Sequence, residues 1–448
     1  MNDGESDRDR DPAEELREMI QRMLSGDGEM DFSALANAAG VSGADSQSIA
    51  GLMQHLQSAL SNPSDEIDWS AGMKQAERVI SQNPGAVSSD ERDATKQAAN
   101  LAALWLDEQT EVGSIGEMEL LSRQQWAQAT MPVWQEIAAP VATSIADALT
   151  QAMGEATPES ESEMIAGAGR LLRNVGGTLF AVQLGQVVGQ LAGEVLAGGD
   201  VGFPLLDDRA AVIPANLPKL TDGLEVPVDQ VRIWLALREF AHARLFQHAK
   251  WLRLQVLSGI RSYAEGIHVD VRAIEDLASE VDPSNPEQLQ ELLRNGSLIP
   301  PRSEEQEQAL ASLETTLALV EGWVDCVTAS AASRLPSAQS IAEAIRRRRA
   351  TGGPAEKAFS TLVGLELRPR RLREASEFWQ KVTDAVGSEK RDSLWAHFDL
   401  VPTADDIDDP SRIIASLKGE RVEPDEMDIA LAQLFDEEEG DGPVDKSE

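Results

Sequence analysis

Apolar residues recur at helical spacing along most of the chain. Six segments place them three or four positions apart, as one face of an α-helix requires: roughly 91–111, 122–153, 161–197, 228–262, 303–333 and 369–386. Clusters of Gly, Pro, Ser and Asp separate these segments and predict loops. Strand signals are confined to short stretches at 211–214 and 223–228. The pattern therefore predicts a mainly α protein, with at most a small β-sheet or hairpin.

The distribution of charge divides the chain into three parts. The formal net charge is −38, and the two ends contribute half of it: 11 acidic against 4 basic residues in the first 31, and 16 against 4 in residues 402–448. We therefore predict an acidic, partly ordered leader at 1–65, one helical core at 66–400 and an acidic, largely disordered tail at 401–448. Within the tail, residues 424–435 have one apolar face and predict a short helix that docks on the core or on a partner.

Composition also excludes several classes of partner and compartment. So acidic a chain repels nucleic acid and anionic membranes, because both require a basic surface. The first residues lack the basic and then apolar start of a signal peptide, and no apolar run is long and uninterrupted enough to span a membrane. A single cysteine excludes an intrachain disulfide. We expect a cytoplasmic protein whose partner is a protein or peptide; its oligomeric state is left open.

Three polar residues interrupt the strongest helical segment, at 228–257. Its apolar stripe is wide enough for the helix to be buried, and it contains Trp234, Leu237, Ala241, Leu245, Ala249, Leu252 and Val256. Arg238, Glu239 and His242 lie within this segment, in the sequence R-E-F-A-H. Buried polar side chains require partners, so these three residues predict either a satisfied polar cluster or a functional site.

The spacing of these residues is that of a zinc-binding motif with one ligand replaced. In H-E-x-x-H, two histidines one helical turn apart bind Zn²⁺ and the glutamate between them activates the metal-bound water. Glu239 and His242 match this pattern, but Arg238 stands where the first histidine belongs. A guanidinium stays protonated and has no lone pair for a metal. The substitution argues against a standard zinc site.

A second segment strengthens the comparison. The sequence "LETTLALVEGWVDCV" carries Glu321 and Asp325 four positions apart, on one face of a predicted helix. Together with "WLALREFAHARLFQHAKWL", it resembles a bacterial zincin-like metallopeptidase family of hydrolases. The resemblance covers most of residues 90–400 and concerns segments rather than a complete catalytic motif. It implies a zincin-like helical core.

The resemblance assigns a role to each candidate residue. His242 and Glu321 would be the remaining metal ligands, Glu239 the catalytic general base, and Asp325 the residue that orients the first ligand. Arg238 departs from the family pattern and puts zinc in doubt. Our hypothesis is that Arg238 pairs with Asp325 and neutralises Glu321 or Glu239, so that these residues form a buried charge network in place of the metal.

A basic stretch at 345–375 stands out in so acidic a chain. It includes the run Arg346–Arg349 just before a predicted loop. Such a run is typical of a solvated helix end with intrachain ion pairs. Alternatively, it binds a carboxylate, a phosphate or the chain's own acidic tail.

Three functions remain open on the sequence alone. The first is a zincin-fold protein without standard zinc catalysis that acts as a binding or scaffold module, with no cofactor. The second is an active metal-dependent peptidase or hydrolase that uses Glu239, His242 and Glu321. The third is a structural helical interaction protein. Metal content would separate the second from the others.

Overall fold

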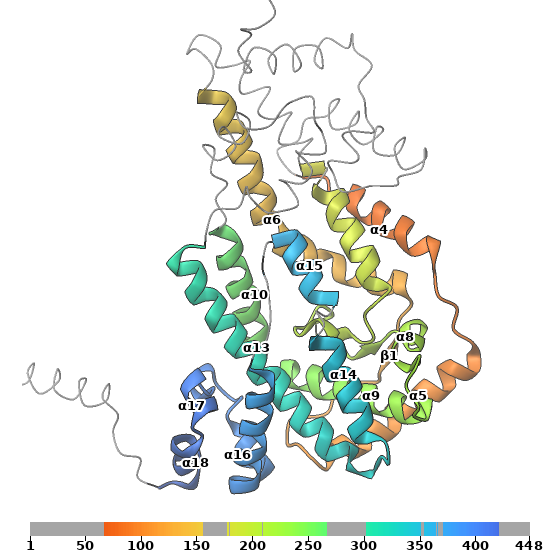
Figure 1. The fold of residues 1–448 in the computed structure, drawn as a ribbon, viewed down its shortest axis with the longest axis vertical. Coiled ribbons are helices and arrows are strands. Elements are labelled where there is room, and N and C mark those ends of the chain that lie inside the picture. The colour runs from red at the N-terminus through yellow and green to blue at the C-terminus, as the bar shows by residue number, and fades with distance from the viewer. Residues whose placement is uncertain are drawn as a thin grey trace, which may run out of the picture.

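The computed structural model describes residues 67–155, 177–178, 180–207, 209–266, 302–350, 354–363, 365 and 371–420. These residues are mainly helical, as predicted (Figure 1). The longer helices are α4 (Ser70–Gln82), α5 (Ser89–Asp107), α6 (Arg123–Glu155), α9 (Val228–His248), α10 (Lys250–Glu265), α13 (Glu304–Ala331), α14 (Ala338–Ala350), α15 (Pro354–Val363) and α16 (Leu372–Ser393). Shorter helical elements are η2 (Gly198–Val201), η3 (Pro214–Asn216), α8 (Pro218–Thr221), η4 (Ala332–Arg334), η5 (Phe398–Leu400), α17 (Ala404–Asp408) and α18 (Ser411–Lys418).

Helices α9 and α13 form the centre of the fold. Helix α9 packs on α5 and α13, and α13 packs in turn on α10 and α16. The largest fully buried side chains are tryptophans from these helices, from α6 and from the segment after α16: Trp126, Trp134, Trp234, Trp323, Trp379 and Trp395. A central helix with apolar side chains over most of its girth is stable only when neighbours cover it on several sides. This packing also buries Glu239, His242 and Arg244 of α9.

Local sequence signals begin and end the central helices. Ser303 starts α13 with a capping box: its hydroxyl accepts from the Gln306 amide, and the Gln306 side chain accepts from the Ser303 amide. Ser88 and Glu91 do the same for α5. The single segment predicted at 228–262 is divided at Ala249, whose backbone leaves the helical region between α9 and α10.

The described residues contain one small sheet. Strand β1 (Glu119–Leu120) pairs in parallel with β2 (Ala211–Val212), and Ala197 adds an antiparallel bridge to Val212. The sequence predicted the strand near 211 but not its partner at 119–120, and residues 223–228 are not a strand. The sheet matters for the site because β2 and the residues around Ala197 both lie against α9.

The structure confirms the predicted fold class in being mainly α with a very small sheet. Among the residues it describes, no helix has both the length and the apolar character needed to cross a lipid bilayer. The leader at 1–65 and the helix predicted at 424–435 lie outside the described residues. Residues 404–418 form α17 and α18, which pack on α16, so the domain boundary at 400 stays a prediction.

Candidate functional site

The candidate residues come together where α9 meets α13 and the element η2. Arg238, Glu239 and His242 lie on α9, and Glu321 and Asp325 lie on α13. In a helix, residues four apart lie on the same face, which places Arg238 with His242 and Glu321 with Asp325. The packing of α9 on α13 brings the two faces together.

Glu239 joins α9 to the two segments that cross it. Its Oε2 accepts from the Gly199 amide at 2.8 Å, and its Oε1 accepts from the Ala211 amide at 2.9 Å. The side chain is buried, and burial raises the pKa of Glu239 to about 7 even though the backbone hydrogen bonds act in the opposite direction. A pKa near neutrality suits a proton acceptor or donor. The geometry also gives Glu239 a structural role, because its carboxyl group positions η2 and β2.

His242 is buried and neutral, with one ring nitrogen unpaired. Burial lowers the pKa of His242 to about 4, and the interaction with Glu321 offsets only part of this effect. Its Nε2 has no hydrogen-bond partner among the described residues. The ring also packs closely on η2, since a Cβ at Gly199 would lie 2.5 Å from its Nδ1. Only glycine allows the backbone to approach the imidazole so closely.

Two arginines bind the carboxylate of Glu321. Arg238 of α9 donates from Nη2 to Oε2, and Arg349 of α14 donates from Nη1 to the same oxygen. Arg349 also donates from Nη2 to Oε1 at 3.2 Å. Burial alone would raise the pKa of Glu321, but the two guanidinium charges prevail and lower it to about 2. Glu321 is therefore ionised, and both of its oxygens are held by cations.

Asp325 lies at the edge of this cluster. Its Oδ1 is 3.7 Å from Arg238 Nη1, and its Oδ2 is 3.8 Å from Arg346 Nη1. Its Oδ2 also accepts from the Ser376 hydroxyl at 3.5 Å. We expected Arg238 to pair with Asp325 and to neutralise Glu321 or Glu239. In the structure Arg238 hydrogen-bonds Glu321, and Asp325 lies at the longer distance of an ion pair.

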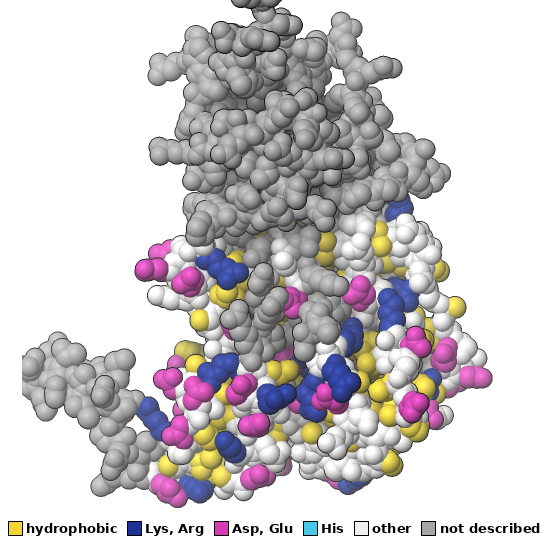
Figure 2. All heavy atoms as spheres, viewed as in Figure 1, with side chains coloured by type: hydrophobic (Ala, Val, Ile, Leu, Met, Phe, Trp, Pro, Cys, Tyr) yellow, Lys and Arg dark blue, Asp and Glu magenta, His cyan; other side chains and the backbone are white. Residues whose placement is uncertain are grey.

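A second ion pair connects α14 to η2. Arg348 donates from Nη1 to both oxygens of Asp200, at 2.9 and 3.1 Å, and from Nη2 to the carbonyl of Glu194 at 2.7 Å. Asp200 in turn accepts from the Leu196 amide at 3.0 Å. The arginine run of α14 therefore closes one side of the site, and dark blue side chains gather over α14 in Figure 2.

A small pocket remains beside these residues. It has room for about one water molecule. Its walls are Leu196, Ala197, Gly199, Asp200, Leu235, Arg238, Glu239 and His242. The pocket places a cation, a neutral imidazole and a carboxyl group of raised pKa around one space. Such a constellation can hydrogen-bond a water-sized molecule.

The donor set does not fit the zinc ion of a standard zincin. Zn²⁺ requires lone pairs from three protein ligands in a catalytic site. The unpaired Nε2 of His242 meets this requirement, but Arg238 brings a fixed positive charge to the position of the first histidine. The oxygens of Glu321 already accept from two guanidinium groups. In the part of the chain that the structure describes, no three His, Cys, Asp or Glu side chains are arranged to hold a metal ion.

Sequence reasoning missed two contributors to the site. Arg349 binds Glu321 as closely as Arg238 does, and Gly199 donates its amide to Glu239. The signal for Arg349 was present in the run of four arginines, which we interpreted as a helix end, a binding patch or a source of intrachain ion pairs. No signal in the sequence marked Gly199, because nothing there shows which glycine faces the imidazole.

Comparison with known proteins agrees with this architecture. A crystal structure described as that of a "putative hydrolase with a novel fold", from Chloroflexus aurantiacus, is similar to this chain with a TM-score of 0.52 and 20% sequence identity. The similarity covers 80% of this chain and 100% of that one, and at this identity it shows a shared fold alone. No curated protein matches the sequence. The model of the zincin-like metallopeptidase family matches residues 67–414, and the chain belongs to that family.

Proposed function

We propose that this protein is a zincin-fold member of its family that works without zinc and acts as a binding module. The observation that carries the proposal is the capture of the Glu321 carboxylate by Arg238 and Arg349. Two guanidinium charges supply at this place the positive charge that a metal ion would bring. Both positive charges would repel a Zn²⁺ ion placed beside them. The repulsion would fall only if Arg238 and Arg349 moved away from Glu321.

The polar groups that remain favour binding over zinc catalysis. Glu239 occupies the position of the general base, but both its oxygens accept from backbone amides. In a zincin the base acts on a metal-bound water, and the donor set here does not fit the metal. Arg238, Glu239 and His242 line one small space, and their hydrogen-bonding groups can contribute to the recognition of a ligand there.

A second candidate is an active metal-dependent hydrolase that uses Glu239, His242 and Glu321. One specific observation favours it: the buried Nε2 of His242 has no hydrogen-bond partner among the described residues. A buried ring nitrogen without a partner is unfavourable, and coordination to a metal would satisfy it. Only the metallohydrolase requires a rearrangement of the site. For the metal to bind, Arg238 and Arg349 would have to leave Glu321.

Metal analysis separates the two candidates. The full chain, purified without chelators and then incubated with zinc, is passed through a desalting column and analysed by mass spectrometry for bound metal. We expect much less than one zinc per chain. The matched variants are His242→Gln and His248→Gln, because His248 is exposed on the same helix. One zinc per chain that His242→Gln abolishes and His248→Gln retains would overturn the proposal in favour of the metallohydrolase.

A further inference from the structure

The space beside His242 is too small for a ligand other than water. It has room for about one water molecule, and Asp200, Arg238 and Glu239 line it together with His242. The buried Nε2 of His242 has no hydrogen-bond partner among the described residues. A ligand larger than water therefore reaches these groups only if one side of the space moves.

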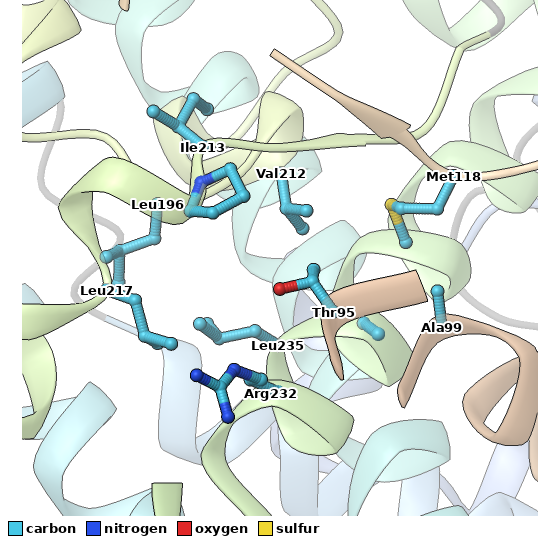
Figure 3. A pocket seen from close by; sticks show the side chains of 11 residues that line it. Thr95, Ala99, Met118, Leu196, Val212, Ile213, Leu217, Arg232 and Leu235 are labelled. Atoms are coloured by element: carbon cyan, nitrogen blue, oxygen red, sulfur yellow. The ribbon is translucent and has the colours of Figure 1, made fainter. Parts of the chain in front are cut away.

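Two sides of this space are held by buried apolar packing. Leu196 and Leu235 form one of them, and Val212, Ile213 and Leu217 lie behind these two side chains (Figure 3). Beyond them, too, there is room for only about one water molecule. The second side is α9 itself, which α5 and α13 cover. Moving either side would expose apolar side chains to water, which opposes the movement.

The arginine run of α14 closes a third side through charged groups. Arg348 donates from Nη1 to both oxygens of Asp200, which lines the space. Arg349 binds Glu321, and Arg238, the other cation on Glu321, also lines the space. The last turn of α14 therefore connects η2 to α13 beside the site.

Helix α14 is held differently at its two ends. Among the described residues, its buried apolar side chains are Ile341, Ala342 and Ile345, which all precede the arginine run. Just before the helix, the Ser337 amide donates to Oε1 of Gln230 on α9 at 2.8 Å. The side chains of residues 346–349 are between 17% and 77% exposed and form ion pairs. Charged groups regain hydration when an ion pair opens to water, so the last turn can detach while the first turns stay in place.

We propose that the last turn of α14 is a lid over the site, and that a ligand enters when this turn detaches. Opening breaks the ion pairs of Arg348 with Asp200 and of Arg349 with Glu321, and both carboxylates then face water or the ligand. The inference concerns access to the site and rests on the proposed function only in that the ligand binds there. Its test uses neither a ligand nor a metal, so the two proposals can fail separately.

The experiment follows a thiol placed in the closed space. Ala197→Cys introduces it, because Ala197 lines the space and lies between Glu194 and Asp200, the two residues that Arg348 bonds. The native Cys326, which is buried on α13, reports unfolding of the core in the same molecule. The full chain is treated with iodoacetamide, and mass spectrometry of its peptides follows each thiol.

We expect the two thiols to respond differently to urea below the unfolding transition. The introduced thiol should react at a rate that urea hardly changes, because local opening exposes little surface. The reaction of Cys326 should accelerate steeply, because it requires the core to unfold. An equally steep response of both thiols would show that the space opens only on global unfolding, and this result would overturn the proposal.

Arg348→Met then assigns the opening to α14. Without its bonds to Asp200 the closed lid is less stable, so the introduced thiol should react about tenfold faster in the absence of urea. Arg347→Met is the matched control on the same turn, since Arg347 is 77% exposed and pairs with Glu343 within α14. An unchanged rate in Arg348→Met, or an equal increase in Arg347→Met, would overturn the proposal.

Hydrogen exchange of the unmodified protein provides a second measurement that needs no substitution. The amides of residues 347–350 should exchange through an opening that urea hardly affects, whereas those of residues 341–345 should exchange only with urea-dependent unfolding. The same steep urea dependence in both groups of amides would contradict a lid that detaches by itself.

Discussion

The guanidinium of Arg238 on α9 bonds the carboxylate of Glu321 on α13, across the interface of the two central helices. By the sequence resemblance, these two positions correspond to a histidine and a glutamate that hold one metal ion in a zincin. Here they form an ion pair that is nearly completely buried, with side-chain exposures of 11% and 2%. Under the function proposed above, this pair takes the place of a metal-mediated connection between the helices.

Removing the charge of Arg238 should destabilise the fold. In Arg238→Met, the buried Glu321 loses one of its two cations, and breaking a buried pair in this way lowers the free energy of unfolding by about 3 kcal/mol. Arg347→Met is the control, because Arg347 is 77% exposed and pairs with a half-exposed glutamate one turn away on the same helix. Urea unfolding should show a change within about 0.5 kcal/mol for this control. Equal effects of the two substitutions would show that the Arg238–Glu321 pair stabilises the fold no more than an exposed ion pair does.

Zinc binding should return only when both guanidinium groups are removed. Arg238→His restores the H-E-x-x-H spacing, but Arg349 still holds both oxygens of Glu321. We expect the double substitution Arg238→His, Arg349→Met to bind zinc about 100-fold more tightly than Arg238→His alone, because a buried like charge worth roughly 3 kcal/mol is removed. Competition with a chromophoric chelator measures the two affinities. Adding His242→Gln should abolish the gain, and tight binding by Arg238→His alone would contradict the role given to Arg349.

Glu239 and His242 should influence stability in opposite directions as pH changes. The folded pKa of Glu239 is raised from 4.5 to about 7, so its contribution to stability is fully present below pH 4.5 and is lost as pH rises through 7. The folded pKa of His242 is lowered from 6.5 to about 4, so the unfolded chain takes up its proton first and stability is lost as pH falls from 6.5 to 4. Between pH 4.5 and 6.5 the two effects nearly cancel.

Single substitutions should reveal each effect. In Glu239→Gln, the free energy of unfolding should rise with pH more steeply than in the unmodified protein, by about 1.4 kcal/mol per pH unit between pH 4.5 and 6.5. In His242→Gln it should rise less steeply by a similar amount. Urea unfolding at several pH values in this window measures both slopes. Slopes that match the unmodified protein would mean that neither group titrates with a shifted pKa.

Adding one methyl group at Gly199 should disturb the site directly. Its Cβ would lie 2.5 Å from Nδ1 of His242, closer than two such atoms can approach. Gly199→Ala should therefore lower the free energy of unfolding by about 2 kcal/mol, because either the ring or η2 must move. Gly113→Ala is the control, since no atom lies within 4 Å of the Cβ position there. A tolerated methyl group at Gly199 would show that η2 does not press on His242.

Much of the fold was predictable from local pattern. The helical spacing of apolar residues predicts α5, α6, α9, α10, α13 and α16 to within a few residues at most ends. This works because a buried helical face imposes its period on the sequence. The pairing of β1 with β2 was not predictable, because it depends on segments distant in the chain. The break between α9 and α10 at Ala249 was not predicted either. Pairing between strands that are distant in the chain leaves no periodic pattern of apolar residues in the local sequence.

The sequence by itself determined which residues deserve consideration as a site. Arg238, Glu239 and His242 stand out because polar residues on a buried helix require partners, and Glu321 with Asp325 stands out through family likeness and spacing. Only the tertiary structure decided which partner each residue has. It places Arg238 on Glu321 more closely than on Asp325, brings Arg349 from α14 to the same carboxylate, and ties Glu239 to backbone amides. The physical reason is that helical spacing determines which side chains share a face, whereas ion pairs across helices depend on how those faces pack.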